Sequence, residues 1–382
     1  MKTAHYTVYF NNTLKPEKKT MDIAEIDKNY AVTTIDGYDI TFYDVFKDAF
    51  WMLEGLPFAE KNRNFFRLPL EMMDKVSEGV NNLLRHTSGG ALRFISDTPA
   101  LSIRHTPAYT LVSDNVPFTT CAGVDVYRRL PGEKTFIHCG TPRYNRCNTE
   151  DMKNPLVCKN ESGQEYEYLI NFPRYGGLEN FAVGIVTGST FRPAPARKVA
   201  KPIVFYGSSI TQGSAASRPG LTYTARLCRA VDATEINFGF AGNARGEENL
   251  AELIANIEMS AFILDYDHNA PTPEHLEATH SRFFKIIREK NPDLPVIMMN
   301  RPANWEFGDR KDKDTRRQIV FNTFRKAVKN GDKNVWFIDG ESLFEGADRF
   351  ECTSDLTHPN DMGFERMYLK VLPVLKEALG LI

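Results

Sequence analysis

The sequence lacks the features that would direct it to a membrane or to a polyanion. No apolar run approaches the roughly 18 residues that a membrane-spanning helix needs. Lys and Arg number 47 against 49 Asp and Glu, which gives a formal net charge of -2, so no nucleic-acid partner is expected. The first residues have neither the apolar core nor the cleavage site of a signal peptide, so we expect a cytoplasmic protein.

Cysteine is also scarce. Six cysteines in 382 residues do not make a disulfide scaffold, and none of them forms a CxxC pair, so we expect reduced and mostly buried thiols. The spacing of His268, His275 and His280 does not place them on one helix face. We therefore expect solvated or loop histidines, and we predict no metal and no cofactor.

What the sequence contains is two halves of different character. Up to residue 195, short runs that alternate apolar and polar residues are separated by turn residues, and they are 92–95, 101–104, 109–112, 124–128, 166–170 and 181–186. This pattern predicts a mainly β N-terminal domain over residues 1–195, built as an antiparallel sandwich. Residues 73–84 have helical spacing that Gly89-Gly90 would end, and residues 1–65 are expected to be irregular with weak strands.

After a proline-rich and basic segment at 191–202, which predicts an extended linker, short apolar runs alternate with amphipathic stretches. The runs are 203–206, 235–238, 261–264, 296–299 and 335–338. The alternation predicts a domain over residues 203–382 with a parallel sheet and helices on both faces, one of them burying Phe321, Phe324 and Val328. Ligands bind such sheets at the carboxyl ends of the strands, so the following loops should hold the chemistry.

The first of these loops reads Gly207-Ser-Ser-Ile-Thr-Gln-Gly213. Ser209 follows a strand directly and is flanked by glycines, which is how a nucleophile on a sharp turn is presented. A phosphate-binding glycine loop is the alternative, although neither GxGxxG nor GxxxxGK[ST] is present.

The last loop contains Asp355 and His358 in an Asp-x-x-His spacing. A serine nucleophile needs a general base, and the base needs an acid that orients it, so this loop can supply both groups. A polar cap at the start of the final helix is the alternative for His358.

Two further loops contain possible donors to an oxyanion, the backbone N–H of Gly242 and the side chain of Asn269, beside the N–H of Ser209. Both residues are also common in ordinary turns. Arg301 and Trp305 follow the fourth strand and could bind a sugar, or could form an exposed loop with one packed tryptophan.

In this order, the four loops resemble the serine, glycine, asparagine and histidine blocks of the SGNH (GDSL-like) hydrolases. The first block has Ser208 where the family usually has aspartate, the third matches only at Asn269, and the Asp-x-x-His block is intact. The resemblance covers about residues 200–380. It implies a flavodoxin-like three-layer α/β/α domain with a five-stranded parallel sheet, and a serine esterase with a Ser-His-Asp triad.

The string Gly123-Val-Asp-Val-Tyr127 resembles the Gly-x-Asp-Leu-Tyr signature of a jelly-roll-like sandwich domain that precedes the SGNH domain in a two-domain, generally bacterial subgroup. Ser217-Arg-Pro-Gly220 is similar to the same subgroup. The resemblance implies hydrolysis of short acyl esters, above all acetyl esters, on a small-molecule or oligosaccharide substrate. A lipid-directed esterase or thioesterase, an acyltransferase, and a carbohydrate-binding protein with a decayed site are the alternatives. Nothing in the sequence indicates an oligomeric state.

Overall fold

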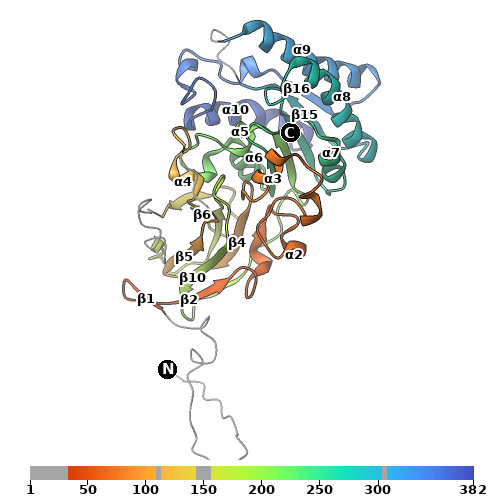
Figure 1. Cartoon of the computed structure of the whole chain (residues 1–382). Helices are drawn as coiled ribbons and strands as arrows, with labels where there is room; N and C mark the ends of the chain where they lie inside the picture. Colours follow the sequence, from red (N-terminus) through yellow and green to blue (C-terminus); the bar gives the residue numbers. More distant parts are fainter. Residues whose placement is uncertain (1–32, 109–112, 143–155, 303–307) are drawn as a thin grey trace, which may run out of the picture.

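The computed structural model describes residues 33–108, 113–142, 156–302 and 308–382. Figure 1 shows the β strands of the first half gathered below an α/β region formed by the second half. The predicted strand at 109–112 lies outside the described residues, as does Trp305.

The second half contains the five predicted strands, and every neighbouring pair in their sheet is parallel. They are β12 (Ile203–Gly207), β13 (Glu235–Gly239), β14 (Ala261–Asp265), β15 (Val296–Met299) and β16 (Val335–Ile338). The strand order is β13-β12-β14-β15-β16, which is the flavodoxin-like order. The prediction of a five-stranded parallel sheet is therefore confirmed.

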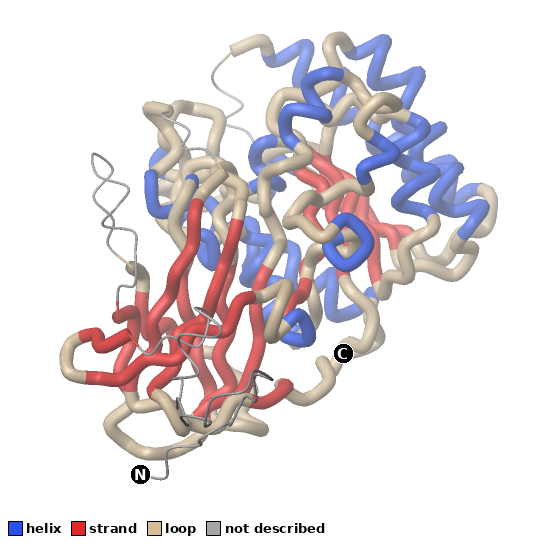
Figure 2. The backbone as a smooth tube through the Cα atoms, turned by 60° about the horizontal axis from the view of Figure 1, so that its bottom comes forward, coloured by secondary structure: helices blue, strands red, loops and turns tan. Residues whose placement is uncertain are grey.

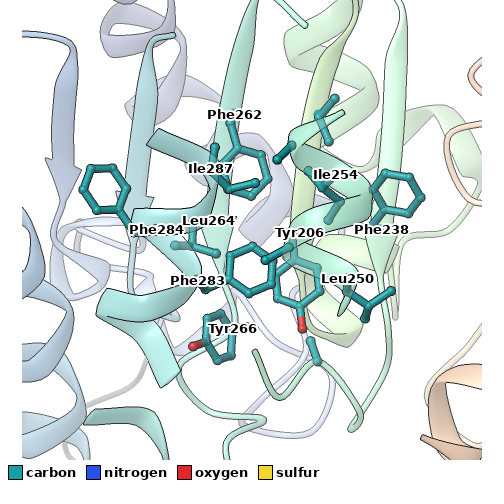
Figure 3. Packing of buried hydrophobic residues seen from close by; sticks show 14 of the residues in the cluster. Tyr206, Phe238, Leu250, Ile254, Phe262, Leu264, Tyr266, Phe283, Phe284 and Ile287 are labelled. Carbon is teal, nitrogen blue, oxygen red and sulfur yellow. The ribbon is translucent and has the colours of Figure 1, made fainter. Parts of the chain in front are cut away.

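Helices cover both faces of this sheet because its strands are apolar on both sides. Tyr206 points into one apolar cluster with α7 (Glu248–Ala255), α8 (Pro273–Lys290) and α9 (Arg310–Lys329), and Figure 3 shows part of this cluster. Phe205 points into the opposite cluster, with α6 (Tyr223–Val231) and α10 (Asp361–Ala378). Successive strand residues thus fill opposite layers, as the period of two requires.

The expected apolar face of α9 is wrong at one position. Val328 is 49% exposed, whereas Phe321 and Phe324 contact Phe337 of β16. The buried stripe of α9 runs instead through Arg316, Val320, Thr323 and Ala327. The hydrophobic pattern misplaced the stripe because two of its members are polar, and both make hydrogen bonds inside the protein.

Two antiparallel sheets make up most of the first half, and Figure 2 shows their strands beside the α/β region. One has the order β1 (Thr33–Ile35), β2 (Tyr38–Asp44), β10 (Asn180–Val186), β5 (Ala100–Thr106), β8 (Leu156–Lys159). The other has the order β11 (Arg192–Pro193), β4 (Ala91–Ser96), β9 (Tyr166–Asn171), β6 (Asp125–Arg129), β7 (Ile137–Gly140), with β3 (Leu53–Glu54) paired to β4. Side chains from both sheets, Ile103 and Phe94 among them, share one apolar cluster. The jelly-roll-like sandwich stays a prediction.

The helices of this half are short, and they include α2 (Ala59–Asn62) and α4 (Phe118–Cys121). The helix expected over 73–84 is only α3 (Glu78–Leu83), because Ser77 caps its first turn. Gly89 does not end it. A Cβ at Gly89 would lie 2.9 Å from the backbone of Asn237, so the glycine lets the chain pass close to β13 of the other half.

The predicted linker is extended but held in place. Arg192 and Pro193 pair with β4 as strand β11. The Arg197 side chain, 8% exposed, forms ion pairs with Glu54 at 2.6 Å and with Asp232 at 3.1 Å. The segment therefore joins the two halves by contacts as well as by the chain.

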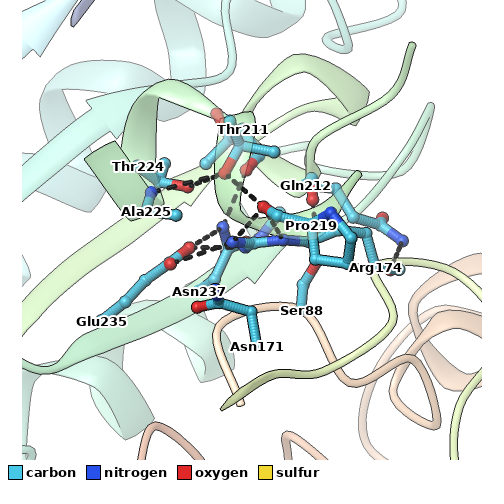
Figure 4. Close-up of polar contacts among 12 residues, drawn as sticks. Ser88, Asn171, Arg174, Thr211, Gln212, Pro219, Thr224, Ala225, Glu235 and Asn237 are labelled. Carbon is cyan, nitrogen blue, oxygen red and sulfur yellow. Dashed lines mark hydrogen bonds and ion pairs between the residues drawn. The ribbon is translucent and has the colours of Figure 1, made fainter. Parts of the chain in front are cut away.

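Buried polar contacts fasten one half to the other. Figure 4 shows the guanidinium of Arg174, which forms an ion pair with Glu235 at 2.7 Å and donates to the carbonyl oxygen of Pro219. Asp125 accepts hydrogen bonds from Arg218 at 2.7 Å and from the backbone N–H of Gly220 at 2.8 Å. The two subgroup strings singled out in the sequence thus bind one another. The domain limits at 195 and 203 remain a prediction.

Among the described residues, no disulfide is formed by the five cysteines Cys121, Cys139, Cys158, Cys228 and Cys352, and all except Cys139 are buried. Within the described residues, none of the helices combines the length and apolar character that a membrane span requires.

Candidate active site

The turn after β12 fixes Ser209 in place. Ser208 accepts a hydrogen bond from the N–H of Ile210 and so caps the short helix α5 (Ser209–Gln212). A Cβ on Gly207 would lie 2.1 Å from Thr211 Oγ1, so only glycine permits this tight strand-to-helix turn. As the first helical residue, Ser209 has a backbone N–H with no partner within the helix.

The loop before α10 brings His358 to this serine across 149 positions of sequence. Backbone hydrogen bonds from Ser354 N to His358 O, and from Asn360 N to Cys352 O, close the loop into a narrow hairpin-like arch. Ser209 Oγ lies 2.9 Å from His358 Nε2, which is hydrogen-bond distance.

Asp355 holds the other side of the ring. Its Oδ2 lies 2.7 Å from His358 Nδ1, while its Oδ1 accepts from the backbone N–H groups of Thr357 and His358. Because a carboxylate only accepts, Nδ1 carries the ring proton and Nε2 is left to accept from Ser209.

Electrostatics keep this carboxylate charged. Burial raises the pKa of Asp355, but hydrogen bonds from the His358 backbone, from its ring and from Asn115 outweigh that effect and lower the pKa to about 2. Above that pH the carboxylate is ionised and can stabilise an imidazolium.

Comparison with known proteins assigns both halves of the chain to described families. Residues 200–376 match the GDSL-like lipase/acylhydrolase family, and residues 40–191 match the GxDLY family, the N-terminus of SGNH hydrolase-type esterases. The chain belongs to the SGNH (GDSL-like) hydrolases. No match is found among curated proteins.

Solved structures agree with this assignment. A Bacteroides ovatus ATCC 8483 protein described as a GDSL-like lipase is 27% identical, with a TM-score of 0.78 over 90% of this chain and 98% of that one. A salicylyl-acyltransferase from a tetracycline biosynthetic pathway is 22% identical, with a TM-score of 0.65 over 83% and 90%. An acetyl xylan esterase from the rumen bacterium Butyrivibrio proteoclasticus is 12% identical, with a TM-score of 0.53 over 89% and 99%. The last two likenesses show the fold alone.

The residues predicted for the glycine and asparagine blocks follow the two strands that flank the serine's strand. Gly242 follows β13 and Asn269 follows β14, and these two strands are the neighbours of β12 on either side. Gly242 has a φ of 70°, which favours glycine, and it is exposed. Asn243, the other amide in that loop, donates to Ala241 O at 2.8 Å and is engaged within its own turn.

The N-terminal half braces these loops, which the sequence did not reveal. Gln212 Nε2 contacts His86 Nδ1 at 2.6 Å, and Gln212 Oε1 accepts from the N–H of Ala241, next to Gly242. The Tyr175 hydroxyl donates to the carbonyl oxygen of Ser209. A histidine or tyrosine in a β domain carries no local pattern that predicts such contacts.

The expected substrate residues are only partly placed. Arg301 donates its backbone N–H to Asp267 at 3.0 Å, and it lines a cavity together with Leu356 and Thr357 of the histidine loop.

The prediction of solvated or loop histidines is wrong for one of the three. His280 is buried in α8 against Thr323, and burial lowers its pKa to about 4. The side chain of His268 is 8% exposed and contacts Asp267 at 3.2 Å. His275, near the start of α8, is half-buried, and its Nε2 contacts the carbonyl oxygen of Arg245. His268 lies in a loop, as expected, whereas tertiary packing buries His280 inside a helix.

Within the described ranges, one group of possible metal ligands exists, formed by Asp265, Asp267 and His268 with atoms within 4.8 Å of one another. Protein contacts already use two of its members, because Asp267 Oδ1 is bound by His268 Nδ1 and by the N–H of Arg301. Burial and the charge of Asp267 raise the pKa of Asp265 to about 8, so Asp265 is mostly protonated at neutral pH. A neutral carboxylic acid is a poor ligand for a divalent cation.

This buried acid predicts a pH-dependent stability. The folded protein keeps a proton on Asp265 that the unfolded chain releases above its ordinary pKa of 3.8, so stability falls from about pH 4 until the pH passes about 8. Asp265→Asn mimics the neutral acid and removes this loss. Its melting temperature should therefore rise relative to wild type between pH 5 and 8, by roughly 5 °C, in thermal unfolding scans.

The exposed Asp74→Asn variant is the control and should track wild type. If the difference in melting temperature between Asp265→Asn and wild type stays constant from pH 5 to 8, the buried acid is not held neutral.

Proposed function

We propose that this SGNH hydrolase is a serine esterase that removes short acyl groups, above all acetyl, from carbohydrate. The observation that carries the proposal is the unbroken chain of hydrogen bonds from Ser209 through His358 to Asp355. It supports the roles of nucleophile, general base and orienting acid for these three residues.

In the proposed reaction Ser209 Oγ attacks the ester carbonyl carbon while its proton passes to Nε2 of His358. The backbone N–H groups of Ser209 and Gly242 and the side-chain amide of Asn269 would stabilise the charge that develops on the carbonyl oxygen. The imidazolium, held by Asp355, then protonates the departing alcohol. Water hydrolyses the acyl-serine by the same route, so every step uses protein groups and needs no metal ion.

A cavity beside the histidine loop supports a polar substrate. It has a volume of about 360 Å³ and touches Leu356 and Thr357. The rest of its lining is largely polar and charged: Asp267, His268, Asn300, Arg301, Asp309, Asp312, Lys313 and Arg316. Such groups suit the hydroxyls of a sugar and offer little to a long acyl chain. An acetyl xylan esterase has the same fold, so the fold is compatible with this activity.

The test is incubation with a panel of acetylated glycans, with released acetate as the measurement. We expect release from at least one glycan, and release should continue in the presence of a strong chelator. On nitrophenyl esters, acetate should be cleaved about tenfold or more faster than octanoate, because the described lining of this cavity is largely polar and added methylenes would gain little binding energy there. A preference for octanoate would favour a lipid-directed esterase, and rescue of chelated enzyme by zinc would refute the metal-free mechanism.

Acyl transfer is the second candidate, because the fold is shared with a salicylyl-acyltransferase. An acyl-serine can pass its acyl group to an alcohol as well as to water. Adding a sugar acceptor and measuring acylated sugar against free acid would separate the two reactions. A decayed binding protein would give neither product.

Asn269→Ala should lower kcat by about 10²–10³, the usual cost of one lost oxyanion donor. KM should change much less, because the donor acts mainly on the charge formed in the transition state. Steady-state kinetics on nitrophenyl acetate measure both constants. Asn243→Ala is the comparison variant, and its kcat should fall less, because the Asn243 amide is already bound to Ala241. An unchanged kcat in Asn269→Ala would move the role to Asn243 or another group.

A further inference from the structure

One residue of the N-terminal half reaches the proposed catalytic pair. Asn115 lies between β5 and α4, some 240 positions before Asp355 in sequence. Its Nδ2 is 2.8 Å from Asp355 Oδ2 and 3.1 Å from His358 Nδ1. The site is thus completed by a side chain from outside the α/β region.

The orientation of this amide follows from its partners. Asp355 Oδ2 can only accept, so it must face the NH₂ group of Asn115. The opposite end is consistent, because the Ser113 hydroxyl donates to Asn115 Oδ1 at 2.7 Å. A flipped amide would set two oxygens against each other at 2.8 Å.

Asn115 and His358 therefore donate to the same carboxylate oxygen. The other oxygen of Asp355 accepts two backbone N–H groups, so four donors surround the carboxylate. An extra donor on Oδ2 fixes the plane of the carboxylate, and it also draws off part of the negative charge that would attract the ring proton.

We propose that Asn115 is a positioning residue for the reaction. It holds Asp355 in the geometry that orients His358, and it lowers the basicity of the Asp355–His358 pair. Full activity therefore requires the N-terminal half to be docked. The inference rests on the proposed function. Among the described residues, a further titratable group near the ring is His268, in the loop after β14. It faces Asp267, and burial lowers its pKa, so it brings no positive charge at neutral pH.

The test compares Asn115→Leu, which keeps the branching at Cγ but loses the donor, with Asn115→Asp, which keeps the shape but sets a second carboxylate against Asp355. For Asn115→Leu we expect kcat on nitrophenyl acetate to fall about tenfold with KM within about threefold. The midpoint of its pH–rate profile should move upward by about half a unit, because the carboxylate regains charge. For Asn115→Asp, kcat should fall further below wild type at pH 8 than at pH 6, because at pH 6 one of the two acids is more readily protonated.

Asp114→Ala is the matched control, because this neighbouring side chain is exposed, and it should behave as wild type. A lowered melting temperature with an unchanged pH midpoint in both Asn115 variants would show a structural role only and overturn the inference, as would kcat within twofold of wild type. These outcomes leave the proposed function intact if hydrolysis by the full-length protein still depends on Ser209. If that dependence is absent, the proposed function fails as well, and the two failures are distinguishable.

Discussion

Ser209→Ala should abolish ester hydrolysis, with kcat on nitrophenyl acetate reduced by about 10⁴–10⁶. The reason is that Ser209 is the hydroxyl that the structure brings to His358, with Oγ 2.9 Å from Nε2. Without the nucleophile, only the oxyanion donors and substrate binding would remain to accelerate attack by water. Substrate binding itself should persist, so acetylated glycans should still protect the variant against thermal unfolding.

The neighbouring Ser208→Ala is the matched control. This serine is also buried, but it caps α5 and makes no contact with His358 among the hydrogen bonds of the described residues. We expect a stability loss of about 1 kcal/mol from the lost cap and less than a tenfold loss in kcat. If Ser209→Ala kept more than a tenth of the wild-type rate, the serine mechanism would be wrong.

Asp355→Asn should lower kcat by about 10²–10⁴. Both oxygens of Asp355 accept hydrogen bonds, Oδ1 from backbone N–H groups and Oδ2 from His358 and Asn115. An asparagine must turn its NH₂ group toward one of these sets of donors, so one side of the loop is repelled in either orientation. The loss should stay below that of Ser209→Ala, because the half-exposed loop lets water hold the ring in part of the molecules.

Asp361→Asn makes the same chemical change close by, where the carboxylate accepts from the backbone N–H of Ser217. Its kcat should lie within about threefold of wild type. Rates for Asp355→Asn within threefold of wild type from pH 6 to 9 would mean that another group orients His358. The triad would then be a dyad.

The parts of the fold that local pattern controls were predictable. The five strands of the parallel sheet are continuous apolar runs, and each was found in the structure where the sequence placed it. The pattern failed where a buried position is polar, as on α9, and where a segment owes its shape to a partner far along the chain. Gly89 is such a case, because its missing Cβ serves the approach to Asn237 rather than the end of a helix.

For the site, the sequence identified the residue types but not their neighbours. The Asp-x-x-His spacing within one loop requires only local geometry, which is why Asp355 and His358 could be paired in advance. Asn115 carried no signal, because nothing near it in sequence reports what lies 240 positions further on.

The sequence by itself determined the α/β half, its SGNH blocks and the candidates Ser209, Asp355 and His358, because strand periodicity and loop spacing are short-range properties. Only the tertiary structure decided that Ser209 and His358 lie 2.9 Å apart, that Asp265 is buried beside Asp267, and that Asn115 crosses from one half to the other. These features depend on which surfaces pack together, and packing is set by complementary shape and charge summed over many distant residues.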